Sequence, residues 1–210
     1  MSNMKFFKSD VPAWIMIVCM AFVIVNCISV ILNHYEMLPL HELYFENDYD
    51  ENIYLSMSKF GLIINPLTVV FWIIAMVYAI KNKLSVISIF AIVIALLAAA
   101  YYTFDYYTLY NLESYYRART VLDSLSDVRP WAGYLQFFAM ILLSLAANVS
   151  VLAKILLIVT FILANLSPLA YLFQYLGCNE LPNALIVIIF SIAGIVALCL
   201  KRSSQEVQEQ

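Results

Sequence analysis

The residues best suited to chemistry gather between residues 34 and 59, which read HYEMLPLHELYFENDYDENIYLSMSK. This stretch holds both histidines of the chain, His34 and His41, and a single cation, Lys59. It also holds six carboxylates: Glu36, Glu42, Glu46, Asp48, Asp50 and Glu51. Imidazole nitrogen and carboxylate oxygen are ligands that zinc and similar metals accept. Residues 46–52, however, lack the turn glycine and the distal glutamate of a calcium-binding loop.

We therefore favour an acidic, solvated loop, and a metal site built on the two histidines is the alternative. The central carboxylates of this loop would attract a positively charged partner protein and steer its approach. The expected partner-binding residues here are Glu46, Asp48, Asp50 and Glu51. Neither a metal ion nor a cofactor is expected.

A second candidate is residues 101–116, YYTFDYYTLYNLESYY, in which seven of sixteen residues are tyrosine. Tyrosine prefers the lipid headgroup level, where its ring is apolar and its hydroxyl is hydrated. On a straight helix Tyr116 would lie roughly 20 Å beyond Tyr102, which is too far for one headgroup layer. The helix must therefore lie flat on the membrane or project from it. A projecting helix would make Tyr110, Tyr115 and Tyr116 partner-binding residues.

A third set consists of polar side chains within apolar segments, in the half of each segment nearest the longer loops. They are Asn26, Asn65, Gln136, Asn165 and Ser167. Pro66 and Pro168 adjoin this set, and proline within a membrane helix frees backbone carbonyls that then need other partners. Together these groups suggest a pocket for a small neutral solute. The alternative is that they form ordinary hydrogen bonds between helices.

The elements that position these residues are apolar helices. The chain is 64% hydrophobic and 12% charged, whereas soluble domains have about 25% charged residues. Six segments lack Asp, Glu, Lys, Arg and His, and each is long enough to cross a membrane. They are residues 12–33, 60–80, 84–104, 131–153, 155–177 and 181–200. We therefore expect an all-α, polytopic integral membrane protein, a six-helix bundle over residues 1–200.

Lys154 alone interrupts residues 131–177, so the chain must turn between Asn148 and Lys154. If one of the two flanking segments lies in the membrane interface, only five helices span. No glycine or proline occurs from residue 84 to residue 129, and Pro130 is expected to end that helical run. An apolar arc within the run predicts an amphipathic helical excursion in the outer loop 105–130. The arc consists of Ala118, Val121, Leu122, Leu125 and Val128.

Short connections with positive charge predict the orientation of the bundle. One side carries Lys5, Lys8, Lys81, Lys83, Lys154, Lys201 and Arg202. Both termini are therefore expected in the cytoplasm, with residues 201–210 as a disordered tail and the plasma membrane as the location. The net charge of −3 argues against a nucleic-acid partner.

The spanning segments offer no histidine or carboxylate to activate a nucleophile, so no enzyme is expected. The favoured interpretation is a non-enzymatic membrane protein of the accessory, exclusion or immunity type. Its expected partners are the lipid bilayer and another membrane or extracytoplasmic protein, which it would bind through the acidic loop and the tyrosine-rich helix. The alternative is a transporter or channel for a small neutral solute.

Overall fold

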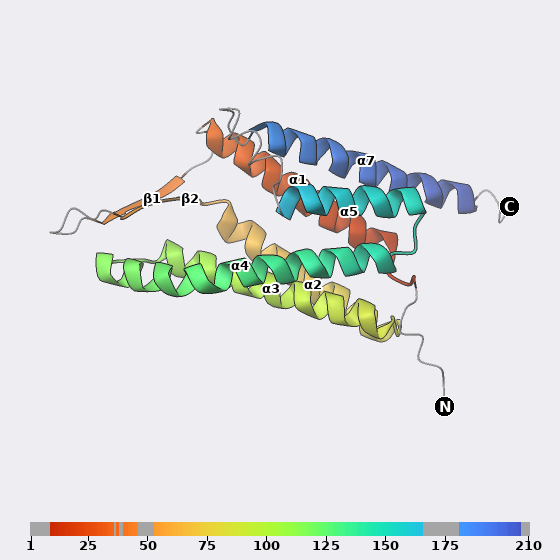
Figure 1. Ribbon diagram of the computed structural model, residues 1–210, viewed down its shortest axis with the longest axis horizontal. Coiled ribbons are helices and arrows are strands. Elements are labelled where there is room, and N and C mark those ends of the chain that lie inside the picture. The colour runs from red at the N-terminus through yellow and green to blue at the C-terminus, as the bar shows by residue number, and fades with distance from the viewer. Residues whose placement is uncertain (1–8, 36, 38–39, 46–52, 166–180, 207–210) are drawn as a thin grey trace.

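The computed structural model describes residues 9–35, 37, 40–45, 53–165 and 181–206. The chain is mostly helical (Figure 1). Its elements in chain order are α1 (Ala13–His34), β1 (Leu40–Phe45), β2 (Ile53–Ser58), α2 (Gly61–Lys81), α3 (Val86–Tyr110), α4 (Tyr115–Ala146), α5 (Val151–Asn165) and α7 (Leu181–Glu206).

The helices form an elongated bundle in which α2 lies beside α3, α3 beside α4, α4 beside α5, α5 beside α7 and α7 beside α1. α1 begins and α7 ends at one end of this bundle, the terminal end (Figure 1). At the opposite, distal end, α3 and α4 extend beyond the other helices, and β1 and β2 lie next to this extension. The segments that the sequence places in the two long loops therefore meet at the distal end.

Among the described residues, five helices are long and apolar enough to cross a membrane: Ala13–His34, Gly61–Lys81, Val86–Tyr110, Asp127–Ala146 and Leu181–Cys199. The remaining apolar helix, α5, has 15 described residues, which is shorter than a bilayer requires. The rest of the segment expected to span over residues 155–177 lies outside the described residues. The turn expected between Asn148 and Lys154 lies at residues 147–150, because α4 ends at Ala146 and α5 begins at Val151, so the span expected over 131–153 ends earlier than expected.

Small residues line the interior of the bundle and allow the helices to approach closely. Ala75 and Ala79 of α2, together with Ala91 and Ala95 of α3, are almost completely buried. Many large apolar side chains point outward, and Val77 of α2 is 61% exposed, although others such as Trp72 and Phe161 are buried in the bundle. A soluble protein rarely exposes such a continuous apolar surface, so this arrangement is typical of helices solvated by lipid.

At the terminal end, residues before α1 contact the start of α3 and the turn that follows α4. The Asp10 carboxylate accepts hydrogen bonds from the Ser85 N–H, from Ser85 Oγ (3.2 Å) and from Ser88 Oγ (2.7 Å). Ser85 is the N-cap of α3, so the carboxylate also lies at the positive end of that helix. Val11 N–H donates to Ala146 O (3.0 Å), and Asn148 N–H donates to Val11 O (2.9 Å). We call these contacts of Asp10 and Val11 the N-terminal clasp. The clasp connects α1 to the start of α3 and to the turn between α4 and α5.

Residues 34–59 contain a β-hairpin, which the expectation of an all-α chain did not include. β1 and β2 pair antiparallel, with Leu43 opposite Leu55 and Phe45 opposite Ile53. The physical reason is alternation: apolar residues recur at every second position of IYLSMS, which gives a strand one apolar face. The hairpin uses that face to pack against α3 and α4.

Two further expectations about the 105–130 segment are wrong. The helical run expected from residue 84 to residue 129 is interrupted, because α3 ends at Tyr110 and the chain reverses over residues 111–114 before α4 begins. Pro130 does not end a helix, because α4 continues through it as one 32-residue helix. A proline removes a single helix hydrogen bond, and packing against a neighbouring helix can hold the two halves in line. α7 is likewise helical as far as Glu206, into the segment expected to be a disordered tail.

Pro66 lies inside α2 and has no N–H to donate to the carbonyl of Leu62, four residues earlier. The Tyr107 hydroxyl of α3 donates to that carbonyl instead, at 3.1 Å. The neighbouring Tyr106 hydroxyl donates to Ser58 O, just before α2. Gly61 allows this approach, since a β-carbon there would overlap the Tyr106 ring. Two tyrosines of α3 thus complete the backbone hydrogen bonding at the start of α2.

We expect Tyr107→Phe to lower the free energy of unfolding by about 0.5–1 kcal/mol, because Leu62 O loses its donor. In a Pro66→Ala background the same substitution should have almost no effect, since alanine at this position supplies the missing helix N–H. Unfolding in mixed micelles with increasing dodecyl sulfate measures both values, and Tyr116→Phe is the control. An equal loss in the two backgrounds would contradict the assigned role of the hydroxyl.

Candidate interaction surface

The hairpin and the extended ends of α3 and α4 share a second hydrophobic core, separate from that of the bundle. We call residues 40–45, 53–58 and 106–126 the distal cap. Its buried centre consists of Leu109, Leu112, Ala118 and Leu125. Around this centre pack Leu43, Phe45, Ile53, Leu55, Met57, Tyr101, Val121 and Leu122. Four residues of the expected apolar arc of α4 therefore face this core, whereas Val128 is 46% exposed.

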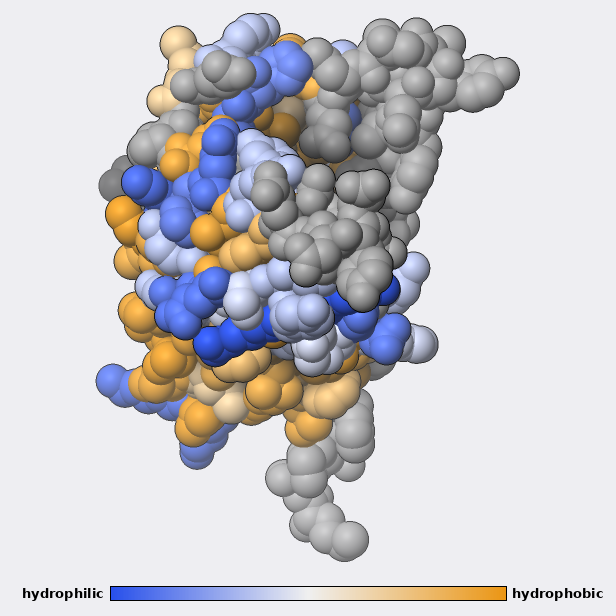
Figure 2. Space-filling model, turned by 90° about the vertical axis from the view of Figure 1, so that its left-hand side faces the viewer, coloured by the Kyte–Doolittle hydropathy of each residue, from blue (hydrophilic) through white to orange (hydrophobic). Residues whose placement is uncertain are grey.

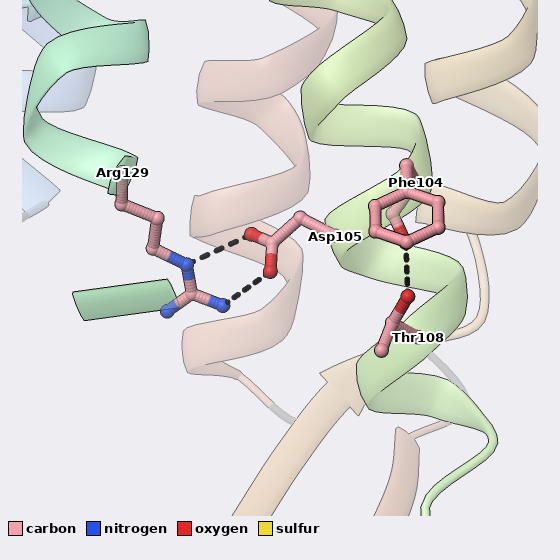
Figure 3. A network of polar contacts seen from close by, with 4 residues as sticks. All are labelled: Phe104, Asp105, Thr108 and Arg129. Carbon is pink, nitrogen blue, oxygen red and sulfur yellow. Dashed lines mark hydrogen bonds and ion pairs between the residues drawn. The ribbon is translucent and has the colours of Figure 1, made fainter. Parts of the chain in front are cut away.

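An ion pair joins α3 and α4 where the cap meets the bundle (Figure 3). Arg129 Nε donates to Asp105 Oδ2 at 2.8 Å, and Arg129 Nη2 donates to Asp105 Oδ1 at 3.1 Å. The side chain of Asp105 is 8% exposed and that of Arg129 is 41% exposed. Two parallel hydrogen bonds fix the guanidinium in the plane of the carboxylate. The pair therefore sets the relative position of the two helices.

The position of this pair along the helices matches the thickness of a membrane. From the start of α3 at Val86, Asp105 lies about 29 Å along the helix axis at 1.5 Å per residue. Arg129 lies about 26 Å before the end of α4 at Ala146. A hydrocarbon core is about 30 Å thick. Both charged groups thus lie about one core thickness from the terminal end of the bundle.

The three tyrosines expected to bind a partner differ in exposure. Tyr110 stacks on His41 with ring centroids 4.1 Å apart, and His41 Nε2 lies 3.2 Å from Tyr110 O. Tyr115 is 8% exposed, and its hydroxyl accepts a hydrogen bond from Arg119 Nη1. Tyr116 is 74% exposed. Tyr110 and Tyr115 therefore stabilise the cap, and Tyr116 is the one of the three that lies open at its surface.

The expected acidic residues Glu46, Asp48, Asp50 and Glu51 lie outside the described residues, in the connection between β1 and β2. Of the two histidines, His34 packs edge-on against Tyr35, and His41 is held by Tyr110. Within the described part of the chain, no group of three or more histidine, cysteine or acidic side chains is placed to hold a metal ion.

The residues of the expected neutral-solute pocket lie on different helices. Asn26 of α1 is exposed, whereas Asn65 of α2 and Gln136 of α4 are half-buried. Among the residues that the structure describes, no hydrogen bond joins these three to one another. Asn165 ends the described part of α5, and Ser167 lies outside the described residues. The described contacts thus bring none of these side chains together into one site.

Two tyrosines that the sequence did not single out are exposed on the described part of the hairpin. Tyr44 of β1 lies directly opposite Tyr54 of β2, and they are 55% and 58% exposed. Both point away from the cap core, as does the exposed Glu42. Figure 2 shows the distal end, where hydrophilic side chains cross the middle and apolar side chains remain at the margin. The alternation in HELYF could have identified this outward face.

Comparisons with known proteins give no relative: no family model, curated protein or solved structure matches this chain.

Substitutions at the ion pair should have unequal effects on stability. Arg129→Gln leaves the buried Asp105 carboxylate without its partner and should lower the free energy of unfolding by about 2 kcal/mol. Asp105→Asn should lower it by only about 1 kcal/mol, because the half-exposed guanidinium can reach water. The double variant should lose less than the sum of the two. Denaturation in mixed micelles measures all three, and equal, additive losses would contradict the structural assignment.

Proposed function

We propose that this chain is a non-enzymatic multi-pass protein of the plasma membrane that uses its distal cap to bind another membrane or extracytoplasmic protein. The observation that carries the proposal is the cap itself. It has its own hydrophobic core and presents Tyr44, Tyr54 and Tyr116 on its surface. Exposed tyrosines on a rigid support are favourable binding residues, because they provide contact area with little loss of conformational entropy.

The proposed orientation places the cap outside the cell. Lys81, Lys83 and Lys154 all lie at the terminal end of the bundle, which is the side expected in the cytoplasm. With the hydrocarbon core starting at that end, its outer boundary falls near Asp105 and Arg129. The cap then projects as the outer excursion after the third span. The proposed topology has six spans, with the segment that begins at α5 as the fifth.

A contact function suits the chemistry of the cap better than catalysis does. Its histidine, His41, stacks on Tyr110, and the ion pair of Asp105 with Arg129 joins α3 to α4 where the cap meets the bundle. A catalytic acid or base has to be free to reach a substrate. The surface of the cap carries the exposed tyrosines Tyr44, Tyr54 and Tyr116 together with charged side chains such as those of Glu113 and Arg117, a mixture that suits recognition of a partner. The accessory, exclusion and immunity types of membrane protein act in this way.

Site-specific photo-crosslinking in native membranes tests this proposal. With p-benzoylphenylalanine in place of Tyr44 or of Tyr116, we expect one discrete protein adduct of the same mass at both positions. Val77 is the control, because its side chain is exposed on the lipid-facing surface of α2. The same substitution there should give no such adduct. Normal abundance of the cap variants without any adduct would overturn the proposal.

A further inference from the structure

The hydroxyl of Tyr101 is buried, and among the residues that the structure describes no hydrogen-bond partner reaches it. Tyr101 lies on α3 one helical turn before Asp105, so the two side chains leave the same face of the helix. The Tyr101 side chain packs against the core of the distal cap, whose first buried residue on α3 is Leu109, one turn beyond Asp105. The charges of Asp105 and Arg129 both act on the hydroxyl. The ring of Tyr101 therefore extends alongside the ion pair toward the cap.

An unpaired hydroxyl in this position is unfavourable, because a buried polar group loses its hydration and gains nothing in return. The Tyr101 oxygen is buried, so neither lipid nor bulk water supplies a partner. The acceptor beside it on α3 is the Asp105 carboxylate, which takes one hydrogen bond from Arg129 on each of its two oxygens. A carboxylate oxygen can accept more than one hydrogen bond. Asp105 therefore has the capacity to accept from a phenol.

The two members of the ion pair differ in how readily they can leave it. The side chain of Arg129 is 41% exposed, whereas that of Asp105 is 8% exposed. A long, exposed guanidinium can turn toward water or toward lipid headgroups, but the buried carboxylate cannot follow it. A buried charge that loses its partner is strongly destabilising. Departure of Arg129 is therefore tolerated only if another donor takes its place on Asp105.

We propose that Tyr101 is the reserve donor for Asp105: when Arg129 turns away from the pair, the Tyr101 hydroxyl donates to the carboxylate instead. A phenol that donates to a carboxylate makes a strong, charge-assisted hydrogen bond. The exchange also gives the Tyr101 hydroxyl the partner that it otherwise lacks. The junction between bundle and cap thus has two arrangements, which hold α3 and α4 in the same register but differ in whether Arg129 is free. This inference is independent of the proposed function.

Unfolding of paired variants in mixed micelles with increasing dodecyl sulfate tests the inference. With Arg129 present, Tyr101→Phe should not raise the unfolding equilibrium constant more than about twofold, because the hydroxyl has no partner to lose. Arg129→Met removes every donor at position 129. In that background Tyr101→Phe should raise the unfolding constant at least about fivefold, because Asp105 then loses its remaining donor. An equal effect of Tyr101→Phe in the two backgrounds, whether large or absent, would overturn the inference.

Tyr107→Phe is the matched control on the same helix. The Tyr107 hydroxyl donates to Leu62 O of α2 and not to the ion pair. Its loss should therefore raise the unfolding constant by the same factor with and without Arg129→Met, since sites that share no partner contribute additively. This control separates exchange of donors on Asp105 from a general loosening of α3.

Arg129→Lys provides a milder background that keeps the test decisive if Arg129→Met does not fold. Lysine retains the positive charge but lacks the planar fork that makes two parallel hydrogen bonds, so it leaves one carboxylate oxygen of Asp105 to another donor. Tyr101→Phe in this background should raise the unfolding constant about two- to fivefold. A smaller change there would show that the Tyr101 hydroxyl does not reach Asp105, and the inference would fail.

Discussion

Helices that lipid solvates need partners within the protein for their polar groups, because lipid offers no hydrogen-bonding partner. Three consecutive residues of α3 meet much of this requirement. Asp105 faces α4 and binds Arg129, while Tyr106 and Tyr107 face α2 and donate to Ser58 O and Leu62 O. A helix turns by about 100° per residue, so neighbouring positions can serve different helices. The register among α2, α3 and α4 depends on this short run.

The distal cap depends on this register of the three helices. With α3 and α4 held together at the ion pair, their extensions meet the hairpin and enclose Leu109, Leu112 and Leu125. A two-stranded hairpin is barely stable by itself in water, and packing on a helical surface supplies the burial that it lacks. The protein therefore combines a lipid-solvated bundle with a small unit whose core resembles that of a soluble domain. The two parts share α3 and α4 as continuous supports.

The sequence predicted the elements that depend on composition and missed those that depend on distant contacts. Uncharged runs of sufficient length predicted the five long helices, and the arc from Ala118 to Leu125 predicted the buried face of α4. The hairpin was missed although IYLSMS alternates, because its acidic neighbours favoured the interpretation of a solvated loop. The pair of Asp105 and Arg129 has no local signature, since its members are far apart in the chain. The burial of Tyr115 and the exposure of Tyr116 likewise depend on where the helix hairpin folds back.

The N-terminal clasp also bears on the order in which the chain assembles. Val11 exchanges backbone hydrogen bonds with Ala146 and Asn148, so this contact links the first helix to a turn that is synthesised much later. The clasp cannot close until α4 has been made and inserted, and contacts between such distant residues form slowly. During biogenesis Val11 must therefore lack these two backbone partners until the end of α4 has been made, whereas Asp10 can pair with Ser85 and Ser88 as soon as α3 begins. Closure of the clasp then marks the moment at which α1, α3 and α4 become a single packed unit.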